Sequence, residues 1–255
     1  MTAAGSLPGH ARFEFAAEGL CHAVHHAGDE TAPPLLLLPE LPGIAPGLLL
    51  FAERLRAAGY KVYIAQLFGG TGQRTPLRNA ARLCVSREFA LLRSAVNAPV
   101  TRWLRALAGH ISQLHGDAAV GAIGMCVTGG FVIPLVLHPR VRAVVAAQPS
   151  VPLSLRQLQP VAARLATAEC ALLAVRCRAD RLCPAGRLQR LQQQIALGLT
   201  VREYGGTEDR NAAGQRRHAT YTKEYRLAAD ADEQHPAKQA WADLLAFLAA
   251  HLPRS

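Results

Sequence analysis

The sequence contains little lysine and few aromatic residues, so most of its positive charge comes from arginine. Lys61, Lys223 and Lys238 are the only lysines, although the net charge is +10. The charge is scattered along the chain, and the aromatic residues (5%) do not interleave with it as they do in nucleic-acid-binding proteins. We therefore expect no nucleic acid among the partners and at most a mild attraction for anionic substrates.

Closely spaced cysteine pairs are also missing. The chain has 6 cysteines, none of them in a C-x-x-C motif. The spacings of Cys170, Cys177 and Cys183 do not match a structural zinc site, and no histidine lies near them. We therefore expect reduced thiols in a cytoplasmic protein, with these three as packing residues and no bound metal.

No segment has the pattern of a membrane span or of a secretory signal. Residues 33–51 are the most apolar window, but prolines and Glu40 interrupt it. Residues 1–6 show no basic region followed by an apolar stretch. We expect no membrane partner and no signal segment. The length of 255 residues, 50% of them hydrophobic, is typical of a single α/β domain over residues 1–255.

Short apolar runs alternate with amphipathic segments through most of the chain. This pattern predicts an opening antiparallel hairpin and then a mostly parallel central sheet with helices on both faces. The arginine-rich segment 74–94 is expected to form a loop and a helix over the sheet edge. Strands are expected at residues 13–15, 19–26, 35–38, 61–65, 118–123, 141–147, 171–175 and 200–204, and helices at residues 45–59, 100–115 and 236–251.

One expected strand leads into the pattern of a nucleophile elbow, with sulfur in place of a hydroxyl. The apolar run 118–123 is followed by Gly124-Met125-Cys126-Val127-Thr128-Gly129-Gly130 and an apolar helical segment. Glycines allow a strand to turn sharply into a helix, and such a turn lifts one side chain into a cleft. Most lone cysteines only fill a core, but the order of strand, glycines and helix favours Cys126 as a nucleophile at a helix N-terminus, where negative charge is stabilised.

Other strand exits carry the groups that a thiol nucleophile needs, and these exits meet at one edge of a parallel sheet. Glu40 and Asp180 each follow an apolar strand, and His218 lies in the long connection after the last strand. A nucleophile, an acid and a histidine in this chain order form the α/β-hydrolase arrangement. Glu40 could instead be a plain loop charge, although an acid directly after a run of leucines is poorly explained by solvation.

Each of these partners has a rival in the sequence. His138 would fall at the far end of the elbow helix and His235 opens the last expected helix, so His218 is favoured as the base. A solvated loop histidine is the alternative. Asp209 competes with Asp180 as the acid, but aspartate at such a position is typical of a turn.

With these residues in place, the chain resembles the dienelactone hydrolase family over most of its length. The resemblance rests on Pro-Glu-Leu-Pro-Gly-Ile at residues 39–44, on the elbow around Cys126, and on Asp180 with Pro184 four residues later. It implies Cys126 as the nucleophile, His218 as base and then acid, and Asp180 as the group that orients the histidine.

The resemblance also implies further roles and a reaction. Glu40 would be the resting partner of the thiol, and the backbone N–H groups of Leu41 and Val127 would bind the oxyanion. The substrate would be a small carboxylic ester or lactone, cleaved through a thioester on Cys126 without a metal or an organic cofactor.

Two positions depart from the family pattern. Thr128 stands two residues after the cysteine, where the family usually has glycine. Thr222 stands four residues after His218, where dienelactone-specific members carry an arginine for the substrate carboxylate. Arg82 and Arg87 could supply another cation, although a solvated helix face explains them equally well. The resemblance therefore implies ester or lactone hydrolysis without indicating dienelactone as the substrate.

Two other interpretations stay open. A cysteine amidotransferase-like or stress-protein fold also uses a cysteine elbow, but its acid follows the histidine closely, and the nearest acidic residue after His218 is Glu224. A non-catalytic α/β-hydrolase relative could use Cys126 for binding or redox sensing. Steady turnover of p-nitrophenyl or thioester substrates would favour the hydrolase, and a single burst or plain alkylation would favour the sensor.

Overall fold

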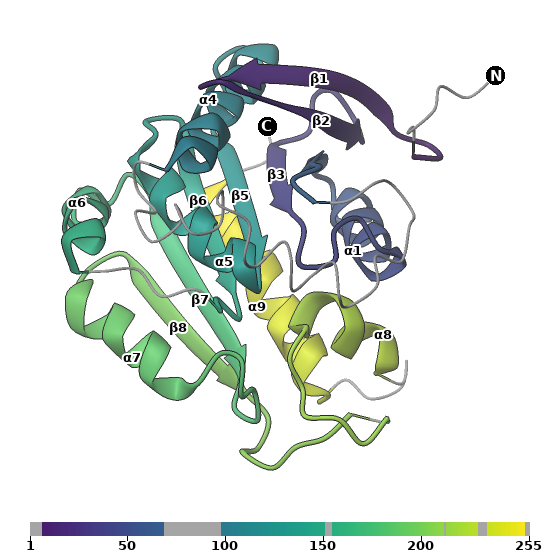
Figure 1. Cartoon of the computed structure of the whole chain (residues 1–255), viewed down its shortest axis with the longest axis vertical. Coiled ribbons are helices and arrows are strands. Elements are labelled where there is room, and N and C mark those ends of the chain that lie inside the picture. The colour runs from purple at the N-terminus through teal and green to yellow at the C-terminus, as the bar shows by residue number, and fades with distance from the viewer. Residues whose placement is uncertain (1–6, 69–97, 151–154, 212, 229–233, 253–255) are drawn as a thin grey trace.

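The computed structural model describes residues 7–68, 98–150, 155–211, 213–228 and 234–252 (Figure 1). Within them, eight strands form one sheet. The strands are β1 (Ala11–Ala17), β2 (Leu20–Ala27), β3 (Pro34–Leu38), β4 (Lys61–Ala65), β5 (Val120–Met125), β6 (Val141–Ala147), β7 (Ala171–Cys177) and β8 (Leu199–Tyr204). The helices are α1 (Pro46–Ala57), α4 (Pro99–Leu114), α5 (Val127–Val132), η2 (Ile133–Leu137), α6 (Leu155–Leu165), α7 (Ala185–Gln194), η3 (Thr220–Glu224), α8 (Tyr225–Leu227) and α9 (Pro236–His251).

The sheet has the order β1-β2-β4-β3-β5-β6-β7-β8. β2 pairs antiparallel with both β1 and β4, and all the pairs from β4 to β8 are parallel. The chain therefore starts with a hairpin at one edge and then builds a parallel sheet outward from β3. This arrangement is the α/β-hydrolase fold, and it confirms the predicted mostly parallel sheet.

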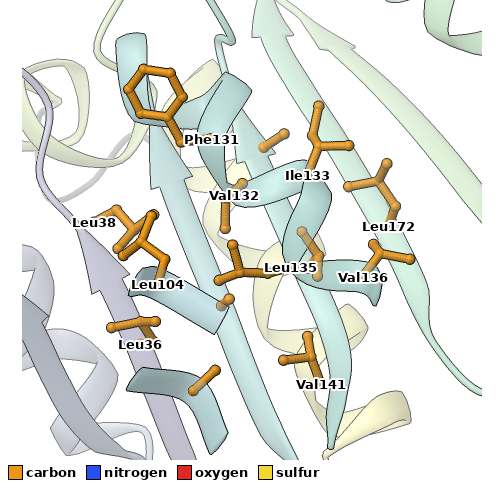
Figure 2. Close-up of a cluster of buried hydrophobic side chains, with 14 of the residues drawn as sticks. Leu36, Leu38, Leu104, Phe131, Val132, Ile133, Leu135, Val136, Val141 and Leu172 are labelled. Atoms are coloured by element: carbon orange, nitrogen blue, oxygen red, sulfur yellow. The ribbon is translucent and has the colours of Figure 1, made fainter. Parts of the chain in front are cut away.

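Helices cover both faces of the sheet because its central strands are apolar on both sides. In β3, Leu36 and Leu38 face a core formed with α4, α5, α6 and α7, whereas Leu35 and Leu37 face a second core formed with α1 and α9. Successive strand residues point to opposite faces, so a run of four leucines supplies both cores. Figure 2 shows part of the first core, where Leu36 and Leu38 lie near Leu104.

The expected strands, and the helices expected at 45–59, 100–115 and 236–251, are present, with shifts at several boundaries. The strand expected at 141–147 and the helix expected at 236–251 have the observed bounds, and β5 ends two residues later than expected, directly before Cys126. The helix α6 was not predicted. The expected loop and helix at 74–94 lie outside the described residues. None of the helices in the described ranges is long and apolar enough to cross a membrane.

The three clustered cysteines are buried and free. Burial raises the pKa of Cys170 to about 12, that of Cys177 to about 11 and that of Cys183 to about 12. These thiols therefore stay protonated at neutral pH. Their environment matches the packing role expected from the sequence.

Candidate active site

The glycines around Cys126 shape the turn between β5 and α5. Cys126 has a φ of 55°, in a region that non-glycine residues rarely adopt and that is often found at functional sites. A Cβ added to Gly124 would come within 2.3 Å of the carbonyl oxygen of Thr128, and one added to Gly129 within 2.9 Å of a backbone oxygen of β6. The predicted sharp turn therefore depends on both glycines.

Thr128 fits the elbow because its hydroxyl bonds to the backbone around it. Its Oγ1 accepts a hydrogen bond from the Met125 N–H at 2.9 Å. The same oxygen lies 2.9 to 3.2 Å from the carbonyl oxygens of Met125, Leu38 and Pro39, one of which accepts its proton. The departure from glycine thus ties the elbow to the end of β3.

Asp180 and His218 form a hydrogen-bonded pair at the strand exits. His218 Nδ1 lies 2.6 Å from Asp180 Oδ2, and the Asp180 side chain is 1% exposed. The other carboxylate oxygen, Oδ1, accepts hydrogen bonds from the N–H groups of Leu182 (2.8 Å) and Cys183 (3.1 Å). With its carboxylate fixed at both oxygens, Asp180 holds the His218 ring with Nδ1 as the donor and Nε2 directed elsewhere.

His218 Nε2 is the nitrogen left to interact with Cys126. Burial lowers the pKa of His218, but the hydrogen bond to Asp180, a polar interaction with the Cys126 thiol and the charges of both groups raise it to about 10. Nε2 is buried and makes no hydrogen bond of ordinary geometry within the described ranges, while the Cys126 thiol donates to Ser150 Oγ at 3.6 Å. The structure therefore brings Cys126, His218 and Asp180 together, with the thiol and the imidazole in electrostatic contact.

Glu40 lies at the exit of β3 and accepts a hydrogen bond from the Thr222 hydroxyl. Burial raises its pKa, against the opposing influence of Thr222, the charge of His218 and the amide of Gln148. The implied contact of Glu40 with Cys126 is not among the hydrogen bonds of the described residues. Glu40 is thus near the other site residues, and its role as the partner of the thiol stays a prediction.

The two backbone groups expected to bind the oxyanion lie at the ends of β3 and β5. Val127 is the first residue of α5, so its N–H has no acceptor within the helix. Leu41 donates none of the backbone hydrogen bonds found in the described loops. Among the described residues neither N–H has a backbone acceptor, and the binding of an oxyanion by these two groups stays a prediction. Arg82 and Arg87, the candidate substrate-binding cations, lie outside the described residues.

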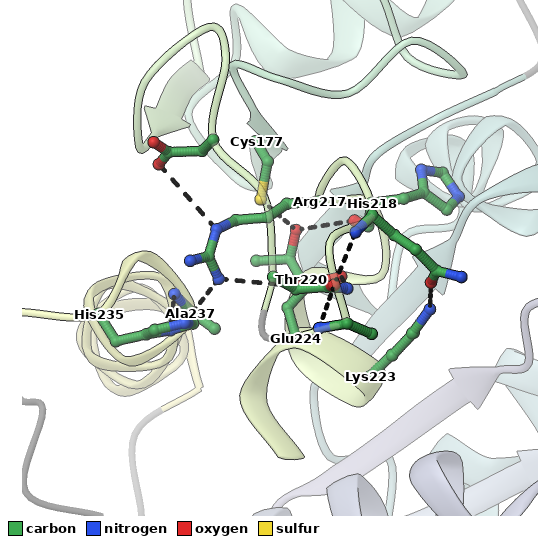
Figure 3. Close-up of polar contacts among 12 residues, drawn as sticks. Cys177, Arg217, His218, Thr220, Lys223, Glu224, His235 and Ala237 are labelled. Atoms are coloured by element: carbon green, nitrogen blue, oxygen red, sulfur yellow. Dashed lines mark hydrogen bonds and ion pairs between the residues drawn. The ribbon is translucent and has the colours of Figure 1, made fainter. Parts of the chain in front are cut away.

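A buried polar cluster supports the segment that carries His218. Figure 3 shows Arg217 between His235 and Glu224. Arg217 Nη1 lies 2.6 Å from His235 Nε2 and 3.6 Å from Glu224 Oε2, and Asn211 Nδ2 donates to Glu224 Oε1 at 3.1 Å. These contacts join the long connection after β8 to η3 and α9, so they fix the backbone next to His218.

Several residues of the site were not identified from the sequence. Gln148 and Ser150 follow β6, and the rule that chemistry gathers at strand exits would have pointed to them. Arg187 on α7 donates to the Pro149 carbonyl at 3.2 Å, which places a cation beside this exit. The Arg217 and Glu224 pair had no comparable signal, because charged loop residues usually indicate solvation. Within the described ranges, no three His, Cys, Asp or Glu side chains gather as a metal site would require.

Comparison with known proteins identifies the family of this chain. The family model of the dienelactone hydrolase family matches residues 22–252. The chain belongs to the dienelactone hydrolase family. As a member of this family, the protein is a hydrolase that acts on ester bonds. No curated protein matches the sequence.

Solved structures of low sequence identity share the fold. A Klebsiella pneumoniae protein named as a dienelactone hydrolase is 17% identical, with a TM-score of 0.68 over 95% of this chain and 98% of that one. A cold-adapted esterase from an Arctic intertidal metagenomic library is 14% identical, with a TM-score of 0.62 over 99% and 98%. A dienelactone hydrolase from Anabaena variabilis is 12% identical, with a TM-score of 0.59 over 95% and 98%.

Proposed function

We propose that the protein hydrolyses small carboxylic esters or lactones with Cys126 as the nucleophile, His218 as the general base and Asp180 as its orienting acid. The observation that carries this proposal is the 2.6 Å hydrogen bond between His218 Nδ1 and Asp180 Oδ2, which directs the other nitrogen of the ring toward the elbow cysteine. A thiol, a base and an acid in this order are the groups that acyl transfer requires.

The reaction proceeds in two halves. In the first, the Cys126 sulfur forms a bond to the ester carbonyl carbon after its proton passes to His218, and the Leu41 and Val127 amides bind the oxyanion. The C–O bond then breaks, His218 protonates the departing alkoxide, and a thioester is left. In the second half, His218 takes a proton from water as the oxygen attacks the thioester carbon. The C–S bond then breaks to release the carboxylic acid, and the proton on His218 returns to the Cys126 sulfur.

Substitution of the nucleophile tests the proposal directly. Cys126→Ala should abolish steady turnover of p-nitrophenyl butyrate while the circular dichroism spectrum stays native, because the residue acts in a cleft. Cys126→Ser should be weakly active, since a hydroxyl is much harder to ionise than a thiol. Near wild-type turnover by a folded Cys126→Ala protein would contradict the assignment. A single burst without steady turnover in the wild type would instead favour the binding or redox-sensing alternative.

Glu40 is proposed as the resting partner that limits the reactivity of the thiol. A carboxylate beside sulfur disfavours a second negative charge, so Glu40→Gln should speed the labelling of Cys126 by iodoacetamide near neutral pH. Labelling rates measured against pH in both proteins test this role. Identical profiles would show that Glu40 does not act on the thiol.

A further inference from the structure

A pocket on the outer side of α4 carries arginine and histidine side chains that the proposed catalysis does not use. It has a volume of about 600 Å³ and lies between the end of η2 and β1, which runs beside α4 (Figure 1). Helix α4 lines it with residues three or four apart, from Arg102 to Gln113, which share one face of the helix. The opposite face, with Trp103 and Leu107, is buried in the core. A pocket of this volume can hold a small organic molecule.

The floor of the pocket is formed by two small residues of α4, and a histidine lies against it. Ala106 and Gly109 line the floor, and a Cβ added to Gly109 would come within 2.9 Å of His138 Nε2. The Arg140 N–H donates to His138 Nδ1 at 3.2 Å, so the proton of the neutral ring is on Nε2. Burial, followed by the charges of Arg105 and Arg140, lowers the pKa of His138. The neutral ring therefore presents a hydrogen-bond donor at the floor.

Arg105 is a partly buried cation without a counter-charge. It makes no hydrogen bond and no ion pair with any described residue. The other buried or partly buried arginines in the described ranges each donate to an acceptor, as Arg142 does to Glu169 and Arg187 does to the Pro149 carbonyl. Burial of a charge is costly unless the charge is paired, so an anion bound at Arg105 would be stabilised.

The charges around Arg105 do not compensate it. Arg102 Nε donates to Glu18 Oε2 at 2.7 Å, so these two charges are paired with each other. Burial, and then the charge of Arg102, lower the pKa of Arg105, and only Glu18 opposes them. Two arginines and one glutamate line the pocket, which leaves one positive charge in excess.

The pocket also has an apolar side. The ring of Phe15 on β1 stacks on that of His110, with centroids 5.1 Å apart and an angle of 23° between the planes. Both rings line the pocket, as do Leu137 and Pro139 at the end of η2. The pocket therefore combines an unpaired cation and a hydrogen-bond donor with aromatic and aliphatic surface, as sites for small organic ligands do.

We propose that this pocket binds a small organic anion, with its carboxylate or phosphate group on Arg105 and His138 Nε2 and its apolar body on the side formed by Phe15 and Leu137. Arg105 and Gly109 are four residues apart and so are neighbours on the helix, which brings the guanidinium to the part of the pocket where His138 lies. A guanidinium pairs with carboxylate and phosphate oxygens through two parallel hydrogen bonds.

This site is separate from the proposed catalytic site. None of the residues of the proposed triad lines the pocket, and neither does Glu40. The wall at Leu137 is the far end of the helical segment formed by α5 and η2, which begins directly after Cys126. The inference therefore does not depend on the proposed hydrolase function.

Calorimetric titration of the wild-type protein tests the pocket with three probes of similar size. Benzoate and phenyl phosphate each carry an oxyanion on a phenyl ring, and benzamide is their neutral counterpart. We expect at least one of the two anions to bind about tenfold more tightly than benzamide, as a hydrogen bond to a charged group allows. The tighter of the two identifies the bound group as a carboxylate or a phosphate. Inorganic phosphate, which lacks the ring, should bind more weakly than phenyl phosphate.

Three variants locate the bound anion. Arg105→Gln should weaken the binding of the anions about tenfold and leave the binding of benzamide unchanged, since it removes the charge. Ala106→Leu should abolish the binding of all three probes, because the longer side chain fills the floor of the pocket. Arg190→Gln is the matched control: it removes the same charge from an exposed arginine of α7, outside the pocket, and should bind the probes as the wild type does.

Melting temperatures show that the variants are folded and report binding independently. Because Arg105 has no partner to lose, Arg105→Gln should melt at the wild-type temperature in the absence of a ligand. The tighter anion should raise the melting temperature of the wild type and of Arg190→Gln, since a ligand that binds only the folded state stabilises it. It should not raise the melting temperature of Ala106→Leu.

The possible results are distinct. Failure of both anions to bind, or equal affinities for the anions and benzamide, would overturn the anion site. Binding that persists unchanged in folded Arg105→Gln and Ala106→Leu proteins would place the anion elsewhere and overturn the pocket. Inorganic phosphate binding as tightly as phenyl phosphate would overturn the organic ligand, because the apolar side would then contribute nothing. None of these assays uses ester turnover, so such a failure would leave the proposed hydrolase function intact.

Discussion

We expect Glu224→Gln to destabilise the protein by about 3 kcal/mol, because it leaves a buried guanidinium without its main counter-charge. Glu224 Oε2 lies 3.6 Å from Arg217 Nη1, and the two side chains are 2% and 13% exposed. Removing one partner of a buried ion pair typically costs about 3 to 5 kcal/mol. The lower end applies because Asp209 Oδ2, 4.0 Å from Arg217 Nε, retains part of the compensation.

An exposed ion pair of similar length provides the control. Arg140 Nη2 lies 3.4 Å from Asp117 Oδ2, with side chains 48% and 60% exposed. Asp117→Asn should therefore cost less than about 1 kcal/mol, because water screens this pair. The asparagine also tolerates the positive φ of this position.

The assay is urea unfolding of the wild type and both variants, followed by circular dichroism at 222 nm. A change in midpoint at constant m-value reports stability alone. Glu224→Gln should also lower kcat in the folded protein, since Arg217 directly precedes His218. Equal losses of stability in the two variants would refute the reasoning, because burial would then make no difference to the energy of the pair.

Three further outcomes are expected. His218→Ala should lower kcat more than Asp180→Asn, which only disorients the ring, and His138→Ala should leave kcat unchanged; loss of activity in the His138 variant would contradict the choice of base. Glu40→Gln should raise the urea midpoint at pH 7 but not below pH 4. The pKa of Glu40 is raised in the folded protein, so its ionisation costs folding free energy only above the pKa of the unfolded state. A difference in midpoint that did not change with pH would count against this. Thr128→Val should cost about 1 to 3 kcal/mol in the same assay by stranding a buried backbone N–H, whereas Thr128→Ser keeps the hydroxyl and should cost less.

Much of the fold could be predicted because the spacing of apolar residues indicates most of its strands and helices. A run of four leucines between breakers indicates a strand buried on both faces, and β3 meets that expectation. The helix α6 was missed although Leu158, Val161 and Leu165 recur at helical spacing and are buried. Its low overall hydrophobicity and the internal Pro160 obscured the pattern, since proline normally ends a helix.

The candidate site was predictable in part for a different reason. Parallel strands bring their exits to one edge, so residues far apart in sequence, such as Asp180 and His218, could be expected to meet. This rule predicts where the site lies in the fold, but it does not predict which side chains form hydrogen bonds with one another. It could not show that Glu40 bonds to Thr222, because that contact joins the exit of β3 to η3, and no pattern fixes the position of η3.

The cluster around Arg217 was beyond sequence reasoning because its members look like solvated loop charges. Only the path of the chain after β8 buries Glu224 against Arg217 and His235. The connection to His218 is long, and a long connection needs such internal contacts to hold one side chain in place. The buried charges therefore hold in place a connection that is too long to be fixed by its two ends alone.

The two residues that depart from the family pattern, Thr128 and Thr222, both form hydrogen bonds at the end of β3. Thr128 and Thr222 each place a hydroxyl against a polar group of the β3 exit, the first on backbone carbonyls and the second on Glu40. At the second position a hydroxyl stands where dienelactone-specific members carry an arginine. A hydroxyl cannot neutralise a carboxylate, so burial dominates and raises the pKa of Glu40. Thr222 therefore holds the Glu40 side chain by a hydrogen bond without supplying a counter-charge.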